Sequence, residues 1–193
     1  MFDPSPSVAD DAISCPFCDI AAFHEPFDPR DPPPPCRLSP TRTTPSSFVA
    51  LSTPDLVAFL DIMPLSRGHL LLCTRAHRPK LTDTTAAEAR ELGVYVRVLS
   101  AALSRATGVV DWNVVQNNGA AAAQVVPHMH FHLIPRPEIR ASGRYSESFT
   151  MFGRGKREEL DEDEAETLVA SLRRHIAHVL KEEEELVAKK SKL

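Results

Sequence analysis

Three histidines alternate with large apolar residues in the segment His128-Met129-His130-Phe131-His132. Successive side chains of a β-strand point to opposite faces, so a strand here places the three imidazoles on one face and Met129 and Phe131 on the other. The apolar face can join a core. Three groups that titrate near neutral pH are costly to hold together unless they bind a ligand or do chemistry. The segment therefore predicts a strand whose polar face carries a functional site.

Length, charge and hydropathy narrow the classes of protein that can carry such a strand. The 193 residues are 42% hydrophobic and allow one domain with tails. A net charge of −4 with scattered Lys and Arg argues against nucleic-acid binding but leaves a single nucleotide open. The sequence has no apolar run of the ~18–20 residues that span a membrane, and residues 1–12 lack the apolar region of a secretion signal. We expect no membrane partner, reduced cysteines, and a cytoplasmic or nuclear setting.

Apolar periodicity predicts an α+β fold, in which an antiparallel sheet of about five strands packs against a long helix and a C-terminal helix. Thr85 and Glu88 fit a capping box at the start of the long helix, and Gly108 fits its C-terminal stop. The second helix is expected over about 161–181, with acidic residues at its start and Arg173, Arg174 and Lys181 toward its end, as the helix dipole favours. The acidic run from Glu182 is expected to be a fraying, solvated extension of this helix. The expected strands are 48–51, 56–60, 69–74, 112–116 and 128–135.

Composition separates a predicted domain at 13–137 from its flanks. Residues 1–12 are small and acidic and are predicted to be disordered. Residues 24–46 include the run Pro32–Pro35 and are expected to form a proline-rich surface insertion, a passive linker rather than a docking motif. Residues 138–193 form a C-terminal extension that contains the second helix.

The segments around the histidines resemble the histidine-triad (HIT) family. Residues 128–134 match its signature of three histidines alternating with apolar residues, and residues 56–64 with Gly68-His69 are similar to its nucleotide-binding strand and turn. Residues 113–119 with Gln124 are similar to its phosphate-side loop. The chain is most similar to the Hint-like nucleoside phosphoramidase branch, in a form close to fungal members. The resemblance implies a HIT-like sheet and a homodimer.

The resemblance also implies a role for each matched residue. His130 would be the nucleophile that attacks the α-phosphorus of a nucleotide. His132 would hydrogen-bond the phosphate, and His128 would assist the leaving group, orient His130 or serve a metal. The other implied contacts are Asp61 with the ribose hydroxyls, Phe59 and Ile62 with the base, and Asn117 and Gln124 with the phosphate or the bridging atom.

Two departures from the branch concern the leaving group. Val125 stands where the branch often has a serine whose hydroxyl is thought to help protonate the leaving group. Residues 120–123 are four alanines in place of a more polar or Gly-rich loop. These differences put the preferred leaving group in question, but not the nucleophile.

Cys15 and Cys18 form a Cys-x-x-Cys motif, which by itself is a weak zinc signal and fits two ordinary cysteines as well. The resemblance adds His77 and His128 as partners and implies a structural Cys2His2 zinc site. A site for one ion made by all three triad histidines is disfavoured, because His128 and His132 would lie ~13 Å apart along a strand.

The remaining histidines are expected to play no part in the chemistry. His24 falls in the flexible insertion, and His69 is expected to pack or cap at a strand start. His175 and His178 are expected on the surface of the second helix.

The implied activity is hydrolysis of purine nucleoside phosphoramidates such as adenosine phosphoramidate, through a nucleotidyl-histidine and without an organic cofactor. One alternative is hydrolysis or phosphorolysis of diadenosine polyphosphates. Another is a nucleotide-binding interaction module without turnover, which docks through Pro32–Pro35.

Overall fold

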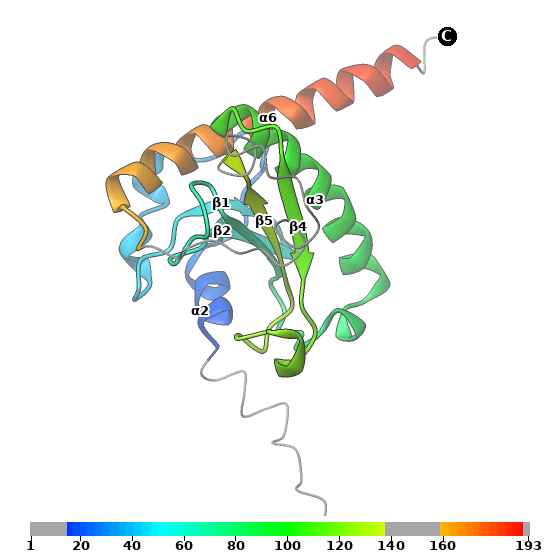
Figure 1. Cartoon of the computed structure of the whole chain (residues 1–193). Helices are drawn as coiled ribbons and strands as arrows, with labels where there is room; N and C mark the ends of the chain where they lie inside the picture. Colours follow the sequence, from blue (N-terminus) through cyan, green and yellow to red (C-terminus); the bar gives the residue numbers. More distant parts are fainter. Residues whose placement is uncertain (1–14, 138–158, 191–193) are drawn as a thin grey trace, which may run out of the picture.

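The computed structural model describes residues 15–137 and 159–190, and its centre is a five-stranded sheet of order β1-β2-β3-β5-β4 (Figure 1). Every neighbouring pair is antiparallel, which confirms the predicted sheet. The predicted disordered segment 1–12 and residues 138–158 of the C-terminal extension lie outside the described ranges. The strands are β1 (Val49–Ser52), β2 (Leu56–Leu60), β3 (Leu70–Thr74), β4 (Trp112–Gln116) and β5 (His130–Pro135).

The central strands are buried on both faces by different helices. Helices α3 (Ala86–Thr107) and α6 (Glu162–Lys190) share one core with alternate strand residues, among them Leu56, Ala58 and Leu60. The intervening residues of β2 belong to a second core with α2 (Pro16–Phe23). This two-residue period follows from the pleat of the strand. Met129 and Leu133 therefore pack in the core with α3 and α6. His130, between them in the alternation, faces α2, where its ring contacts Phe17.

Helix α3 begins and ends where its sequence predicts. The Thr85 hydroxyl accepts from the Glu88 amide at 3.1 Å, and the Glu88 carboxylate accepts from the Thr85 amide at 2.6 Å. Gly108 adopts a positive φ of 71° after the last turn, a conformation that costs glycine little.

Helix α6 extends to Lys190, nine residues beyond the predicted end near Lys181. The first three residues of the acidic run, Glu182 to Glu184, are ion-paired with arginines of other elements rather than solvated. The ion pairs are Glu182 with Arg105, Glu183 with Arg97, and Glu184 with Arg30.

No helix within the described ranges is both long and apolar enough to cross a bilayer.

Two basic or titratable residues of α6 lie differently from the prediction. Arg173 was expected near the end of the helix as a partner of its dipole. It is instead buried in mid-helix, where Nε and Nη2 both donate to the carbonyl of Val49. His178 is exposed as predicted, whereas His175 is half-buried.

The proline-rich insertion is anchored more firmly than the sequence suggests. His24 was expected to be flexible, but its side chain is fully buried and its Nε2 lies 3.0 Å from the Ser47 hydroxyl. Leu38 is also buried, between two short 3-10 helices at Pro35–Arg37 and Pro40–Arg42. These side chains are held by contacts distant in sequence, which composition does not reveal.

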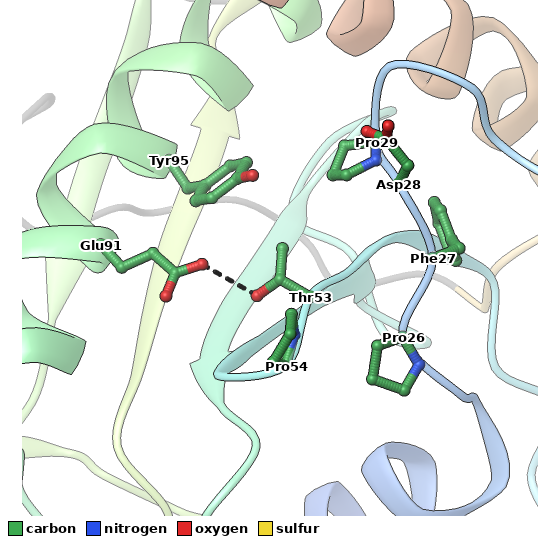
Figure 2. A pocket seen from close by; sticks show the side chains of 8 residues that line it. All are labelled: Pro26, Phe27, Asp28, Pro29, Thr53, Pro54, Glu91 and Tyr95. Atoms are coloured by element: carbon green, nitrogen blue, oxygen red, sulfur yellow. Dashed lines mark hydrogen bonds between the residues drawn. The ribbon is translucent and has the colours of Figure 1, made fainter.

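The insertion bounds an open hollow of about 400 Å³ against α3 and the β1–β2 turn (Figure 2). The Thr53 hydroxyl donates to the Glu91 carboxylate at 3.0 Å across its floor. Pro26 and Pro29 line the hollow, whereas the run at Pro32–Pro35 does not. The lining contains none of the residues predicted to act in chemistry or nucleotide binding.

Burial of His24 predicts a loss of stability in acid. Desolvation, together with the nearby Arg42, Arg173 and Arg75, lowers its pKa from the ordinary 6.5 to about 4. The unfolded chain therefore binds more protons between these values, so this contribution is complete above pH 6.5 and is lost as the pH falls toward 4. We expect the free energy of unfolding, measured in urea, to fall less with decreasing pH in His24→Gln than in the wild type, by up to about 3 kcal/mol. The matched variant His178→Gln should retain the wild-type slope, and an unchanged slope in His24→Gln would contradict the prediction.

Candidate active site and metal centre

Only two of the three triad histidines belong to β5. The strand begins at His130, and the backbone turns just before it, where the His128 amide donates to the Val126 carbonyl at 2.8 Å. The imidazoles of His130 and His132 have centroids 4.7 Å apart. Phe17 of α2 packs edge-on against His130, with the ring centroids 5.1 Å apart. The strand thus presents two imidazoles side by side beneath an aromatic ring that sequence reasoning had not assigned to the site.

A main-chain carbonyl determines where His130 carries its proton. Its Nδ1 lies 2.7 Å from the carbonyl oxygen of His128, which can only accept. Nδ1 is therefore the protonated nitrogen, and in the neutral ring Nε2 holds a free lone pair. Burial lowers the pKa of His130, so the ring is neutral near pH 7. A neutral imidazole with an exposed lone pair is a nucleophile that need not lose a proton before it attacks.

A chain of buried groups determines the proton position on His132 in the same way. The Leu65 amide donates to Nδ1 of His69 at 3.2 Å, so neutral His69 carries its proton on Nε2. That nitrogen lies 3.0 Å from Nδ1 of His132 and donates to it. His132 then keeps its own proton on Nε2. Asp61 Oδ2 lies 3.4 Å from His69 Nδ1 at the far end of the chain.

His69 is fully buried, as expected of a packing residue, but it also links the nucleotide-binding turn to the triad. The prediction that it only packs or caps was incomplete. The cause is the antiparallel pairing of β3 with β5, in which Leu71 is opposite His132. This register is a tertiary property that no local pattern displays.

The hydrogen-bonded relay from the Leu65 amide through His69 to His132 predicts a specific change of tautomer at His132. In the wild type, long-range ¹H–¹⁵N spectra of the imidazoles should show His132 protonated on Nε2. His69→Phe removes the donor to Nδ1, so His132 should become a mixture of both tautomers. His130 serves as the internal control, because its acceptor is a main-chain carbonyl that the substitution leaves in place. An unchanged His132 spectrum would show that His69 does not set this proton.

The residues predicted to bind a nucleoside lie at the end of β2. Phe59 is buried and contacts the ring of Phe17 edge-on at 5.1 Å, while Asp61 is only 8% exposed. Asp61 Oδ1 accepts from the Met63 amide at 2.9 Å. Ile62 is 43% exposed, so its side chain is open to a ligand.

The two predicted phosphate-side amides shape their own loop. Gln124 accepts from the Gly119 amide at 2.6 Å and donates to the Pro79 carbonyl at 2.7 Å. Asn117 donates to the Ala123 carbonyl at 3.5 Å, and Ala123 adopts a positive φ of 63° after the short helix of alanines. Within the described ranges, neither amide is hydrogen-bonded to a triad histidine.

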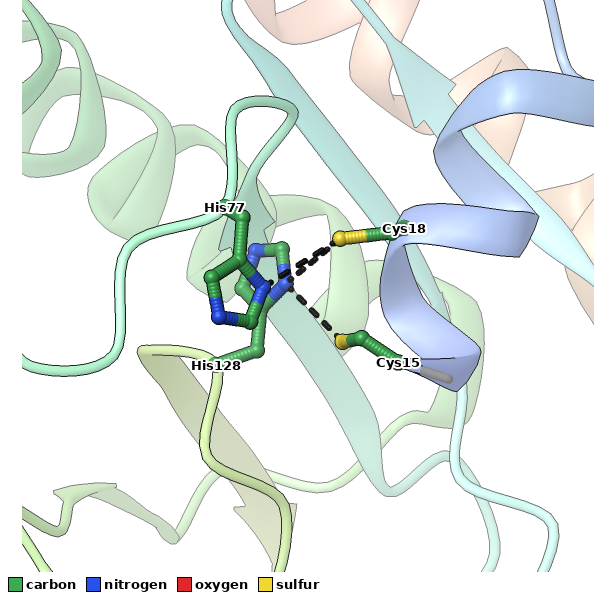
Figure 3. Close-up of side chains that lie close together, drawn as sticks. All are labelled: Cys15, Cys18, His77 and His128. Carbon is green, nitrogen blue, oxygen red and sulfur yellow. Dashed lines mark hydrogen bonds between the residues drawn. The ribbon is translucent and has the colours of Figure 1, made fainter. Parts of the chain in front are cut away.

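Cys15, Cys18, His77 and His128 meet beside this site (Figure 3). Their donor atoms all lie within 4.8 Å of one another. Nδ1 of His128 is 3.4 Å from Cys15 Sγ and 3.6 Å from Cys18 Sγ, and Nδ1 of His77 is 3.3 Å from Cys18 Sγ. The ring of His128 thus faces the cysteines, while its carbonyl orients His130.

The chemistry of this group fits a tetrahedral zinc ion. Zinc–sulfur and zinc–nitrogen bonds of ~2.3 and ~2.0 Å put neighbouring ligands of a tetrahedron ~3.6 Å apart, close to the distances found. Nε2 of His128 donates to the Thr74 carbonyl at 2.7 Å, which leaves Nδ1 unprotonated toward the sulfurs. Burial, with Cys15 beside it, raises the pKa of Cys18 to about 12, so its thiolate needs a cation to form.

Asp61, His69 and His132 form a second close group of possible ligands. Both nitrogens of His69 are already hydrogen-bonded, one to a backbone amide and one to His132. A metal ion there would displace the relay. We therefore interpret the group as a hydrogen-bonded chain.

Several known proteins are similar to this chain. The adenylylsulfatase HINT3 of Arabidopsis thaliana is 39% identical over 128 residues, which are 66% of this chain and 61% of that protein. The adenosine 5'-monophosphoramidase hnt1 of Schizosaccharomyces pombe is 38% identical over 81 residues, 42% of this chain and 58% of that protein. The matched region is therefore less than two thirds of each of these relatives.

The fold is found in solved structures. A hypothetical histidine triad nucleotide-binding protein of Sulfolobus tokodaii has a TM-score of 0.58 at 25% identity, over 69% of this chain and 86% of that one. A zinc-bound histidine triad family protein of Mycobacterium smegmatis has a TM-score of 0.60 at 24% identity, over 88% of this chain and 98% of that one. A family model described as the HIT domain matches residues 42–139. The chain thus belongs to the histidine-triad (HIT) family.

Proposed function

We propose that the chain hydrolyses purine nucleoside phosphoramidates of the adenosine phosphoramidate type through a nucleotidyl-histidine at His130. The observation that carries the proposal is the proton arrangement of two neighbouring rings. His130 presents a free Nε2 lone pair, and His132 presents an Nε2–H donor. Nucleophile and phosphate-oxygen donor thus lie on adjacent imidazoles of one strand. The relative named as an adenosine monophosphoramidase supports the substrate class.

The proposed reaction has two displacements at phosphorus. Nε2 of His130 forms a bond to the α-phosphorus as the phosphorus–nitrogen bond breaks, and the nitrogen takes up a proton and leaves as ammonia. Water then attacks phosphorus, the bond to His130 breaks, and the nucleoside monophosphate is released. His132 donates to a non-bridging oxygen, where negative charge develops.

The nucleoside would bind at the end of β2. Phe59 and Ile62 would contact the base, and the Asp61 carboxylate would accept from the ribose hydroxyls. Asn117 and Gln124 would reach the phosphate with amide hydrogens that their loop bonds leave free.

Adenylyl sulfate is a second candidate substrate, favoured by Val125. This side chain is 90% exposed and has no proton to give, at the position where a hydroxyl would assist an amine leaving group. Sulfate leaves as a stable anion and needs no proton. The Arabidopsis relative is named as an adenylylsulfatase.

One comparison tests both candidates. Adenosine phosphoramidate, adenylyl sulfate and diadenosine triphosphate are offered to the wild type and to Val125→Ser, and kcat/KM is measured for each. The proposal expects turnover of the phosphoramidate, with Val125→Ser faster on it and unchanged on adenylyl sulfate. Turnover of diadenosine triphosphate alone would mean that the substrates are dinucleotides and not phosphoramidates. Tight nucleotide binding without turnover of any of the three would mean that the chain is a nucleotide-binding module and not an enzyme.

We further propose that Cys15, Cys18, His77 and His128 hold a structural zinc ion. Four protein ligands complete a tetrahedron, so such an ion would cross-link α2 to the segments beside β3 and β5 and leave no position for water. The geometry of the four donor atoms supports this proposal.

A homodimer is proposed from the open edge of the sheet. Among the described residues β4 pairs with β5 alone, and Trp112 and Val114 on it are 39% and 42% exposed. Val110, two residues before β4, and Val94 of α3 are 56% and 50% exposed and add to the exposed apolar surface. A second copy would cover that surface. Sedimentation velocity should show a dimer that Val114→Arg dissociates and that Val187→Arg, on the exposed end of α6, leaves intact; a monomeric wild type would contradict the proposal.

A further inference from the structure

Helix α2 has no basic residue of its own near its C-terminus, where a cation would offset the negative end of the helix dipole. It is eight residues long, and in its last turn the His24 amide caps the Ile20 carbonyl but the carbonyls after it have no helical partner. Arg75, in the segment after β3, supplies the missing charge. Its Nη1 donates to the Ala21 carbonyl, and its Nη2 donates to the His24 carbonyl at 3.0 Å.

The same guanidinium also holds the turn between β1 and β2. Nε of Arg75 donates to the Thr53 carbonyl at 3.1 Å, and Nη2 donates to the Ser52 hydroxyl. Ser52 in turn donates to the His24 carbonyl at 3.1 Å. One rigid, planar group thus fixes the end of α2 to the sheet from several directions, which the single ammonium of a lysine cannot do.

The direction of α2 decides what its first turn meets. Cys15 is the residue before the helix and Cys18 lies in its first turn, with Phe17 between them against His130. The imidazoles opposite these sulfurs come from other segments of the chain, after β3 and before β5. Only a fixed helix brings both sulfurs to these imidazoles at the distances found.

We propose that Arg75 is a positioning residue of the metal centre, which holds α2 so that Cys15 and Cys18 are preorganised toward His77 and His128. The inference rests on the zinc site proposed above. Groups that orient metal ligands without touching the metal typically change metal affinity by ~10–100-fold when removed.

The test measures metal binding by the full-length chain. Zinc affinity is determined by competition with a chromophoric chelator, and Co²⁺ is bound in place of zinc so that its absorption reports the ligand geometry. Arg75→Met should weaken zinc by ~10–100-fold and reduce the tetrahedral Co²⁺ bands even at saturation. Arg75→Lys should be intermediate, and it decides the question if Arg75→Met does not fold.

Two controls separate positioning from general stability. Arg42→Met removes one exposed hydrogen bond, at 3.2 Å, to the Phe23 carbonyl of the same helix, and should leave zinc affinity within about twofold. Leu99→Ala destabilises the buried core away from α2 and should also leave it unchanged.

Each contrary result has a distinct meaning. Wild-type zinc affinity in both Arg75 variants would overturn the positioning role and leave the zinc site standing. An equal loss in Leu99→Ala would show that Arg75 acts through overall stability, which also overturns the role. A wild type that binds no zinc would overturn the metal site and the inference together.

Discussion

His130→Ala is expected to lower the turnover of adenosine phosphoramidate by at least about 10⁴-fold, because it removes the atom that forms the covalent intermediate. Nucleotide binding should persist within a few-fold, since the nucleoside contacts at the end of β2 stay in place. Steady-state kinetics measure the first effect, and calorimetric titration with a nucleoside monophosphate measures the second. In the wild type, a denaturing alkaline quench during turnover should trap the nucleotidyl group on the peptide carrying His130, because the phosphorus–nitrogen bond to an imidazole survives in base and is hydrolysed in acid.

His178→Ala is the matched control, because this histidine is exposed on α6 and its ion pair is with Glu182, away from the triad strand. Its kinetics should equal those of the wild type. Turnover by His130→Ala at a tenth of the wild-type rate or more would mean that water attacks phosphorus directly, and the nucleotidyl-histidine would have to be abandoned.

Loss of the proposed zinc ion is expected to have the second largest effect. Cys18→Ser replaces a thiolate by a hydroxyl that zinc binds poorly, so bound zinc should fall from one per chain to almost none. The apparent Tm should fall by about 10 °C, because the ion binds the folded chain alone and links α2 to two other segments. Metal analysis and thermal unfolding, with and without a strong chelator, measure both effects.

Cys36→Ser provides the comparison, since Cys36 is an exposed thiol of the insertion outside the four-ligand group. It should keep both the zinc and the Tm of the wild type. If the chelator does not lower the Tm of the wild type, and Cys18→Ser has the same Tm as the wild type, the four residues are an ordinary cluster and the structural role of zinc fails.

Local patterns were sufficient to predict much of this fold. Apolar segments next to turn residues predicted β2 and β4 to the residue, and the capping box of Thr85 with Glu88 predicted the start of α3. Such features depend on neighbours within a few positions, where side-chain periodicity and backbone capping act. The triad could be located for the same reason, since its three histidines alternate with apolar residues, although only His130 and His132 belong to β5.

The features that were missed depend on pairings between distant segments. The buried His24 is hydrogen-bonded to Ser47, 23 residues away in the sequence, and Glu182 to Glu184 pair with three arginines of other elements. His69 gained its link to His132 from the register of β3 with β5. Composition describes each of these residues in isolation, and so it assigned them to solvent or to a passive role.

The main-chain acceptor of His130 has a consequence for how the family can change over evolutionary time. Every amino acid carries the same carbonyl group, so replacing the side chain at position 128 leaves an acceptor for His130 Nδ1 in place. A lineage can therefore lose or regain a metal-binding residue at this position while the protonation pattern of the nucleophile is inherited unchanged. Metal dependence and covalent chemistry, although they meet in one residue, are free to evolve separately.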